Sequence, residues 1–194
     1  MNKKALIVVD VQNDFCPGGS LAVKDGDQVV DPLNRLTGAT RGRSGWMRIA
    51  SRDWHPGKTS HFDKWPAHCV RHTKGAEFCP GLDISGTNVF LKGTKAGEDA
   101  YSAFDGIGGF GHTLGQFLTI NRVVELYVGG LATDYCVKAT VLDALKKGFK
   151  VTLLTDACRA VDVKPGDGLR AITEMINAGV YVSTTEEVIN ELDN

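Results

Sequence analysis

The sequence predicts an α/β fold over residues 1–194: a single domain with a doubly wound, mostly parallel sheet and helices on both faces. Near-continuous apolar runs, without alternation, are typical of strands that are covered on both faces. Segments with helical spacing of apolar residues lie between these runs, which implies right-handed crossovers between parallel strands. No repeat, linker or low-complexity tract divides the chain, and 194 residues suffice for one core.

The apolar runs predict strands at residues 5–10, 89–92, 123–129 and 150–155. Residues 46–52 are a weaker strand candidate because Arg48 and Arg52 interrupt the run. Helical spacing predicts helices at residues 28–36, 112–120, 134–148 and 167–178.

Two features define the ends of the third predicted helix, since Asp134 is a suitable N-cap and Gly148 a suitable C-cap. Residues 37–45 contain three glycines, which argue against continuing the first helix into this segment. The long polar segments 53–88 and 93–111 are expected to be functional loops.

Composition excludes several classes of function. Lys and Arg total 22 against 23 Asp and Glu, so no strong field attracts nucleic acid or a membrane surface. The apolar run after Lys3 and Lys4 is too short for a signal peptide, and no stretch is long enough to span a membrane. Five widely spaced cysteines fit reduced thiols in a cytoplasmic protein. The G-x-G-x-x-G pattern at residues 106–111 does not directly follow a strand, so dinucleotide binding is not expected.

Four of the five histidines lie between His55 and His72. A carboxylate and three imidazoles in this segment form a ligand set that suits Zn²⁺, with Fe²⁺ or Mn²⁺ as alternatives: Asp53, His55, His61 and His68. The alternative is a polar, aromatic loop whose histidines only form hydrogen bonds.

Three further residues follow predicted strands, where ligands bind in open α/β sheets. Asp10, Lys95 and Cys136 would bring an acid, a cation and a thiol to one rim. Lys95 and a helix N-terminus would favour the Cys136 thiolate, and Asp10 would transfer its proton. Each residue also has a structural explanation: Cys136 as a small buried hydrophobe, Asp10 as the cap of a turn, and Lys95 as a solvated surface side chain.

The chain resembles the nicotinamidase (pyrazinamidase) branch of the isochorismatase-like cysteine hydrolases. The matching segments are residues 5–21, 52–56, 61–62, 65–69, Lys95 with 101–104, and 130–137. The resemblance implies a catalytic triad of Asp10, Lys95 and Cys136, acting on nicotinamide and pyrazinamide through a thioester.

The resemblance also implies the rest of the site. One divalent metal ion would be held by Asp53, His55 and His68, with His61 at a more variable ligand position. An aromatic and apolar pocket is expected from Phe15, Leu21, Trp65, Tyr101 and Leu131. The backbone N–H groups of Ala132 and Cys136 would form the oxyanion hole, with a non-proline cis peptide bond just before Ala132.

Two other hypotheses remain open. The same fold and thiol could act on another small amide or carbamoyl compound, without a preference for pyridine rings. Alternatively, the chain could be a non-catalytic metal-binding or redox-thiol module. The sequence does not fix the oligomeric state, and a homo-oligomer stays open.

Overall fold

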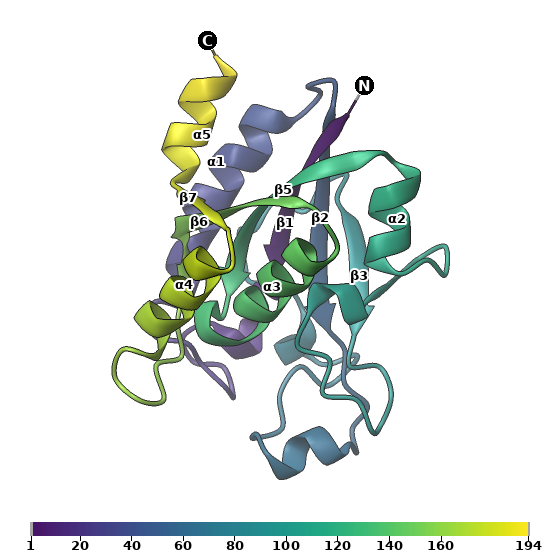
Figure 1. The fold of residues 1–194 in the computed structure, drawn as a ribbon. Coiled ribbons are helices and arrows are strands. Elements are labelled where there is room, and N and C mark those ends of the chain that lie inside the picture. The colour runs from purple at the N-terminus through teal and green to yellow at the C-terminus, as the bar shows by residue number, and fades with distance from the viewer. Residues whose placement is uncertain (1, 194) are drawn as a thin grey trace.

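The strands of the computed structural model, which describes residues 2–193, join one seven-stranded sheet (Figure 1). Its strand order is β4-β3-β2-β1-β5-β6-β7. The strands are β1 Lys3–Val9, β2 Trp46–Asp53, β3 Asn88–Lys92, β4 Ile107–Gly108, β5 Val123–Leu131, β6 Lys150–Arg159 and β7 Tyr181–Ser183. The two-residue edge strand β4 is antiparallel to β3, and the other neighbouring pairs are parallel.

Helices cover both faces of the sheet, which confirms the predicted fold class (Figure 1). They are α1 Val30–Thr40, α2 Leu114–Ile120, α3 Lys138–Lys146, α4 Asp167–Asn177 and α5 Thr185–Leu192. The side chains of β1 alternate between the two cores: Ala5 and Ile7 pack with α2, α3 and α4, whereas Leu6 packs with α1 and α5. This central strand is therefore apolar on both faces, as its sequence predicts.

All five predicted strands are present, including the weak candidate at 46–52. Arg52 does not disrupt β2, because its side chain finds partners beside the end of the strand. The Arg52 guanidinium lies 4.1 Å from the centre of the Trp54 ring, and its Nε donates to the Ala76 carbonyl at 2.6 Å. The sequence analysis did not predict β4, β7 or α5.

Two local predictions are wrong. Helix α1 continues through Gly38 to Thr40, and the chain turns only afterwards, at Gly42 (φ 71°) and Gly45 (φ 87°). A glycine inside a helix costs only about 1 kcal/mol, which the buried face of α1 offsets.

Asp134 does not cap the third helix. Its carboxylate is buried and accepts hydrogen bonds from the backbone N–H groups of Val161 and Asp162, both at 2.9 Å. The helix instead begins with a π-helical turn over Thr133–Val137 that continues into α3. Asp134 thus fixes a neighbouring loop, a long-range role that local sequence does not indicate.

Strand order places the candidate site. The chain moves from β1 through β2 to β3 on one side, then crosses to β5, β6 and β7 on the other. The carboxyl ends of β1 and β5 therefore border the point where the order reverses, which is where open α/β sheets bind ligands. Within the described residues, no helix is long and apolar enough to cross a membrane.

Candidate active site

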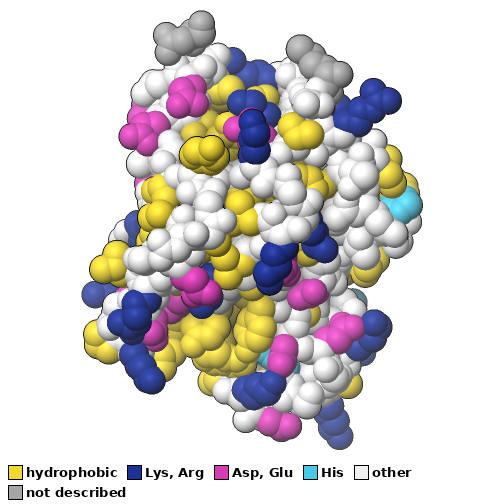
Figure 2. All heavy atoms as spheres, in the orientation of Figure 1, with side chains coloured by type: hydrophobic (Ala, Val, Ile, Leu, Met, Phe, Trp, Pro, Cys, Tyr) yellow, Lys and Arg dark blue, Asp and Glu magenta, His cyan; other side chains and the backbone are white. Residues whose placement is uncertain are grey.

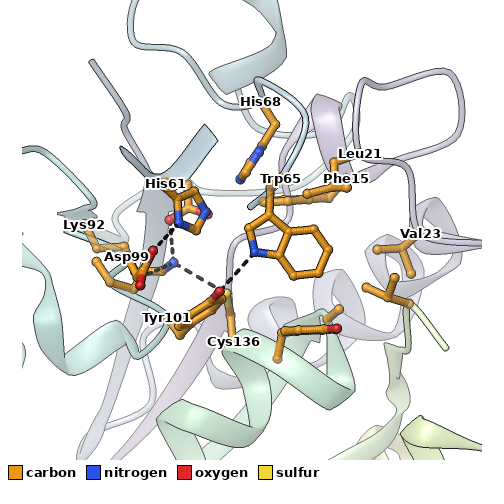
Figure 3. A pocket seen from close by; sticks show the side chains of 15 residues that line it. Phe15, Leu21, Val23, His61, Trp65, His68, Lys92, Asp99, Tyr101 and Cys136 are labelled. Atoms are coloured by element: carbon orange, nitrogen blue, oxygen red, sulfur yellow. Dashed lines mark hydrogen bonds and ion pairs between the residues drawn. The ribbon is translucent and has the colours of Figure 1, made fainter. Parts of the chain in front are cut away.

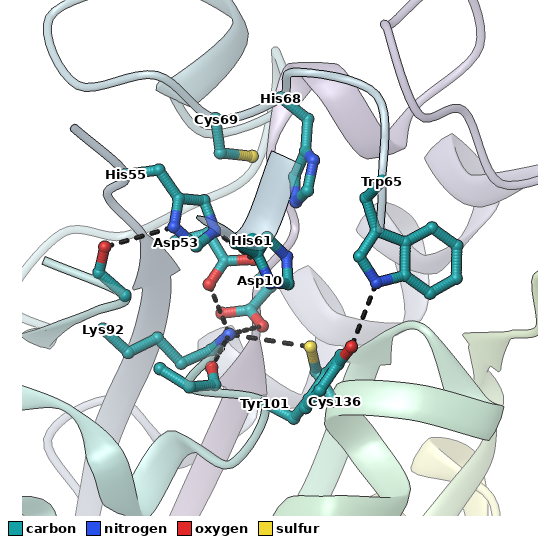
Figure 4. Close-up of polar contacts among 12 residues, drawn as sticks. Asp10, Asp53, His55, His61, Trp65, His68, Cys69, Lys92, Tyr101 and Cys136 are labelled. Atoms are coloured by element: carbon teal, nitrogen blue, oxygen red, sulfur yellow. Dashed lines mark hydrogen bonds and ion pairs between the residues drawn. The ribbon is translucent and has the colours of Figure 1, made fainter. Parts of the chain in front are cut away.

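Four titratable side chains meet where four adjacent strands end (Figure 4). They are Lys92 at the end of β3, Asp53 at the end of β2, Asp10 directly after β1, and Cys136 in the turn after β5. Asp53 and Lys92 are register partners in the sheet. The parallel arrangement of β3, β2, β1 and β5 therefore brings these residues to one rim.

The Lys92 ammonium is the centre of this cluster, and its side chain is fully buried. Its Nζ lies 2.9 Å from Asp10 Oδ2, 2.5 Å from Asp53 Oδ1 and 3.6 Å from Cys136 Sγ. The same ammonium donates a hydrogen bond to the Ala100 carbonyl at 2.9 Å. One buried cation thus faces two carboxylates and the thiol.

The prediction that Lys95 supplies this cation is wrong. The Lys95 side chain is 80% exposed and pairs with Glu98 at 2.8 Å on the surface. Lysine is rarely buried, so Lys92 within an apolar strand is not an obvious site residue from sequence. The signal that identifies Lys92 is its strand position: it lies two residues after the buried Phe90, on the same face, and opposite Asp53.

Burial and charge set the protonation states. Burial raises the pKa of Asp10 to about 6, against the opposing effect of the Lys92 ammonium. Burial disfavours the charged form of Lys92, but the attraction of Asp10 and Asp53 outweighs this and holds its pKa well above the ordinary value. Burial also raises the pKa of the Cys136 thiol, although Lys92 acts in the other direction. At neutral pH the group therefore contains an ionised Asp10 beside a protonated thiol, so Asp10 can accept its proton.

Two polar side chains that the sequence analysis left without a role hold the acidic residues, one at the Asp10 carboxylate and the other at the Asp53 backbone. The Ser51 hydroxyl donates to Asp10 Oδ1 at 2.7 Å. The Gln12 side chain donates to the Asp53 carbonyl at 2.9 Å and accepts from the Asp53 N–H at 2.8 Å. Asp10 itself has a left-handed backbone (φ 48°), a conformation that concentrates at functional sites.

The three predicted histidine ligands form one buried cluster above the carboxylates (Figure 4). One nitrogen from each ring lies within 4.8 Å of those of the other two. Each Nδ1 faces an oxygen acceptor: Gly93 O at 3.1 Å from His55, Asp99 Oδ1 at 2.8 Å from His61, and Pro66 O at 2.7 Å from His68. These contacts assign the proton to Nδ1 and leave the Nε2 lone pair of each ring available to a metal ion.

The donor set fits a divalent metal ion. Among the described residues, the buried Nε2 of His55 has no hydrogen-bond partner, and it lies 3.8 Å from Asp53 Oδ2. Burial lowers the pKa of His55 to about 4 and also lowers that of His68, so both imidazoles are neutral at pH 7. Neutral imidazoles and a carboxylate are ligands that Zn²⁺ prefers. Asp53 thus connects the two parts of the site, with one oxygen toward Lys92 and the other toward the histidines.

Glycine is required at position 93, directly after β3, where the backbone passes close to the candidate metal ligand His55. Its φ is 64°, and a Cβ atom there would collide with the His55 ring. Only glycine lets the backbone pass this close and place its carbonyl at His55 Nδ1.

A pocket opens onto the Cys136 thiol and two of the histidines, His61 and His68 (Figure 3). Its lining includes four predicted pocket residues, Phe15, Leu21, Trp65 and Tyr101, together with Val23, Tyr135 and Val161, which were not predicted. The Trp65 indole N–H donates to the Tyr101 hydroxyl at 3.0 Å, and the Trp65 ring meets Tyr135 edge-on at 5.0 Å. Figure 2 shows hydrophobic side chains gathered below α3 and α4, on the side of the molecule where the long loops lie.

Leu131 does not line this pocket, contrary to prediction. Its side chain is only 1% exposed and belongs to the core on the α1 face of the sheet. The last residue of β5 directs its side chain into this core, and the pocket begins at the next residue, Ala132.

Comparison with known proteins identifies the family of the chain. Residues 4–187 match the isochorismatase domain. The chain belongs to the isochorismatase family. It is 43% identical to the nicotinamidase of Escherichia coli (strain K12), with 95% of this chain and 96% of that protein covered.

Solved structures of the family resemble the fold closely. The pyrazinamidase of Pyrococcus horikoshii in complex with zinc is 41% identical, with a TM-score of 0.82 over 94% of this chain and 99% of that chain. An L. infantum protein in complex with nicotinate is 34% identical, with a TM-score of 0.84 over 95% of this chain and 94% of that chain. The resemblance to the nicotinamidase branch, inferred from sequence, is therefore confirmed.

One backbone feature expected from the isochorismatase-like family is present. The peptide bond between Leu131 and Ala132 is cis, and Ala132 lies beside Cys136 in the pocket lining. The Ala132 carbonyl accepts hydrogen bonds from Tyr135 and Val137, both at 3.1 Å, which orders the turn that carries Cys136.

Proposed function

We propose that this protein is a metal-dependent cysteine amidase that hydrolyses nicotinamide to nicotinate and ammonia, and that it also accepts pyrazinamide. The observation that carries the proposal is the Cys136 thiol, which lies beside the buried Asp10–Lys92 pair at an aromatic pocket bordered by histidines. The similarity to the E. coli nicotinamidase and the nicotinate-bound L. infantum protein supports the substrate. The reaction would serve NAD salvage.

The pocket suits a flat pyridine ring. Trp65 and Tyr101 hold each other through their hydrogen bond, which fixes two aromatic walls before a substrate arrives. Asp53, His55, His61 and His68 would hold the metal ion, and zinc is supported by the P. horikoshii complex. When bound, the metal ion supplies a Lewis-acid site that orients the ring nitrogen.

The first half of the reaction forms a thioester. Asp10 removes the thiol proton while the Cys136 sulfur attacks the carboxamide carbon. The N–H groups of Ala132 and Cys136 stabilise the oxyanion. Asp10 then returns the proton to the leaving nitrogen, the C–N bond breaks, and ammonia departs.

The second half hydrolyses the thioester. Asp10 takes a proton from the attacking water, whose oxygen bonds to the acyl carbon. The C–S bond then breaks, nicotinate leaves, and Cys136 regains its proton. Lys92 stays charged throughout, since it balances the negative charge that moves between Asp10 and the sulfur.

The pKa of Asp10 predicts the acidic side of the pH profile. With a pKa of about 6, Asp10 is an active base above pH 6 and becomes protonated below it. At saturating metal, kcat/KM for nicotinamide should be flat near neutral pH and fall about tenfold per pH unit well below pH 6. A rate that stays constant down to pH 4 would contradict the assignment of Asp10 as the base.

Removal of the metal ion should abolish turnover without unfolding the chain. Dialysis against a chelator should reduce ammonia release by about 100-fold or more, and stoichiometric Zn²⁺ should restore it. Circular dichroism of both forms provides the control for folding. Full activity of the metal-free protein would exclude metal dependence.

Substrate choice separates this proposal from an amidase for another small amide. Ammonia release is measured with nicotinamide, pyrazinamide and benzamide, which lacks a ring nitrogen. The proposal predicts that kcat/KM for benzamide is lower than for the two nitrogen heterocycles by at least about tenfold, since benzamide lacks the ring nitrogen that orients the substrate. Equal rates for all three would favour the alternative.

We assign this reaction to the cytoplasm. All five cysteines are free thiols in the described part of the chain. Persistent free thiols are typical of proteins in a reducing compartment.

A further inference from the structure

The three histidines differ in what holds them. His55 and His68 direct Nδ1 toward backbone carbonyls, of Gly93 and Pro66. His61 alone of the three pairs its Nδ1 with a side chain, the Asp99 carboxylate, at 2.8 Å. A substitution can therefore change the support of His61 without altering the backbone around the other two.

Asp99 is held in place by a second contact. Its Oδ2 lies 2.6 Å from the Lys64 ammonium, while Oδ1 faces His61. Lys64 follows the 3-10 turn Ser60–Asp63 that carries His61, and Asp99 lies in the loop after β3. The carboxylate therefore bridges the two long loops that form the site.

A backbone contact joins the same two loops independently of Asp99. The Ala96 carbonyl accepts hydrogen bonds from the Ser60 N–H at 2.9 Å and the Thr59 hydroxyl at 2.9 Å. Loss of the Asp99 side chain therefore leaves the loops joined, so its effect on His61 can be measured separately.

We propose that Asp99 is a positioning residue that sets the metal affinity of the site through His61. By accepting the Nδ1 proton of His61, the carboxylate fixes the tautomer and ring orientation that present Nε2 to the metal ion. A carboxylate partner also makes the imidazole a stronger ligand than a carbonyl partner does. This inference rests on the metal site of the proposed function, not on its substrate, and adds a residue outside the predicted ligand set.

The test is the Zn²⁺ dissociation constant, measured by competition with a chromophoric chelator in the absence of substrate. Asp99→Ala should weaken Zn²⁺ binding by about 10- to 100-fold, the range for loss of such a partner. Asp99→Asn keeps an oxygen acceptor without the charge, so its affinity should fall between those of Asp99→Ala and the parent. Lys64→Met, the matched control, removes the ion pair but not the imidazole contact and should stay within about threefold of the parent.

A second pair of variants tests whether the effect passes through His61. Zn²⁺ affinities of His61→Ala and His61→Ala/Asp99→Ala should agree, since the carboxylate then has no imidazole to position. The proposal is overturned if Asp99→Ala binds Zn²⁺ like the parent, if its loss persists in the His61→Ala background, or if Lys64→Met weakens binding equally. Because no substrate is present, a protein that binds zinc but does not hydrolyse nicotinamide would refute the proposed function and leave this inference standing.

Discussion

Cys136→Ala is expected to lose nicotinamide hydrolysis by about four orders of magnitude or more, the scale of a lost nucleophile. The sulfur is the atom that would bond to the acyl carbon, and within this group Asp10 and Lys92 only move and balance charge around it. The rate of ammonia release from metal-loaded protein measures the effect.

Cys158→Ala is the matched control for this variant. Cys158 is also a buried thiol, whose pKa is raised to about 12 by burial, but it does not line the pocket. Its substitution should leave kcat within about threefold. Turnover that survives in folded Cys136→Ala would refute thiol catalysis.

Lys92→Met should abolish activity, whereas Lys95→Met should leave it unchanged. Without Lys92, the buried carboxylates of Asp10 and Asp53 lose their shared cation, which destabilises the fold by about 3–5 kcal/mol. We expect ammonia release to fall at least about 100-fold. Lys95 pairs only with Glu98 at the surface, so Lys95→Met should retain activity within about twofold.

Two further measurements keep this comparison informative. Thermal unfolding of Lys92→Met separates loss of the fold from loss of catalysis. Lys92→Arg keeps the charge but not the compact ammonium geometry, so it should be more stable than Lys92→Met and still slow. Activity that depends on Lys95 rather than Lys92 would contradict the assignment of the buried cation.

The sequence predicted the central strands because burial on both faces leaves a continuous apolar run, as in residues 5–9 of β1. It did not predict β4 and β7 because two- and three-residue edge strands carry little pattern. Helix α5 did have a local signal, since Thr184 and Glu187 form a capping box.

Site residues were predictable where residue type alone restricts the chemistry. The clustering of His55, His61 and His68 in one segment indicates a candidate metal site, because imidazoles are common ligands of zinc. Lys92 was not predicted, because its role depends on the pairing of β3 with β2, which places it opposite Asp53. Asp99 was not predicted for a similar reason: its partner His61 is distant in sequence, and only the fold brings the two loops together.

The most direct test of nucleophilic catalysis by Cys136 is to detect the acyl-enzyme. Metal-loaded protein is mixed with nicotinamide, quenched in acid during turnover, digested and analysed by mass spectrometry. We predict a nicotinoyl group, labile to hydroxylamine, on the peptide that contains Cys136, and none in Cys136→Ala. Steady turnover without any acyl group on Cys136, under conditions that trap the thioester of a control cysteine amidase, would contradict the account.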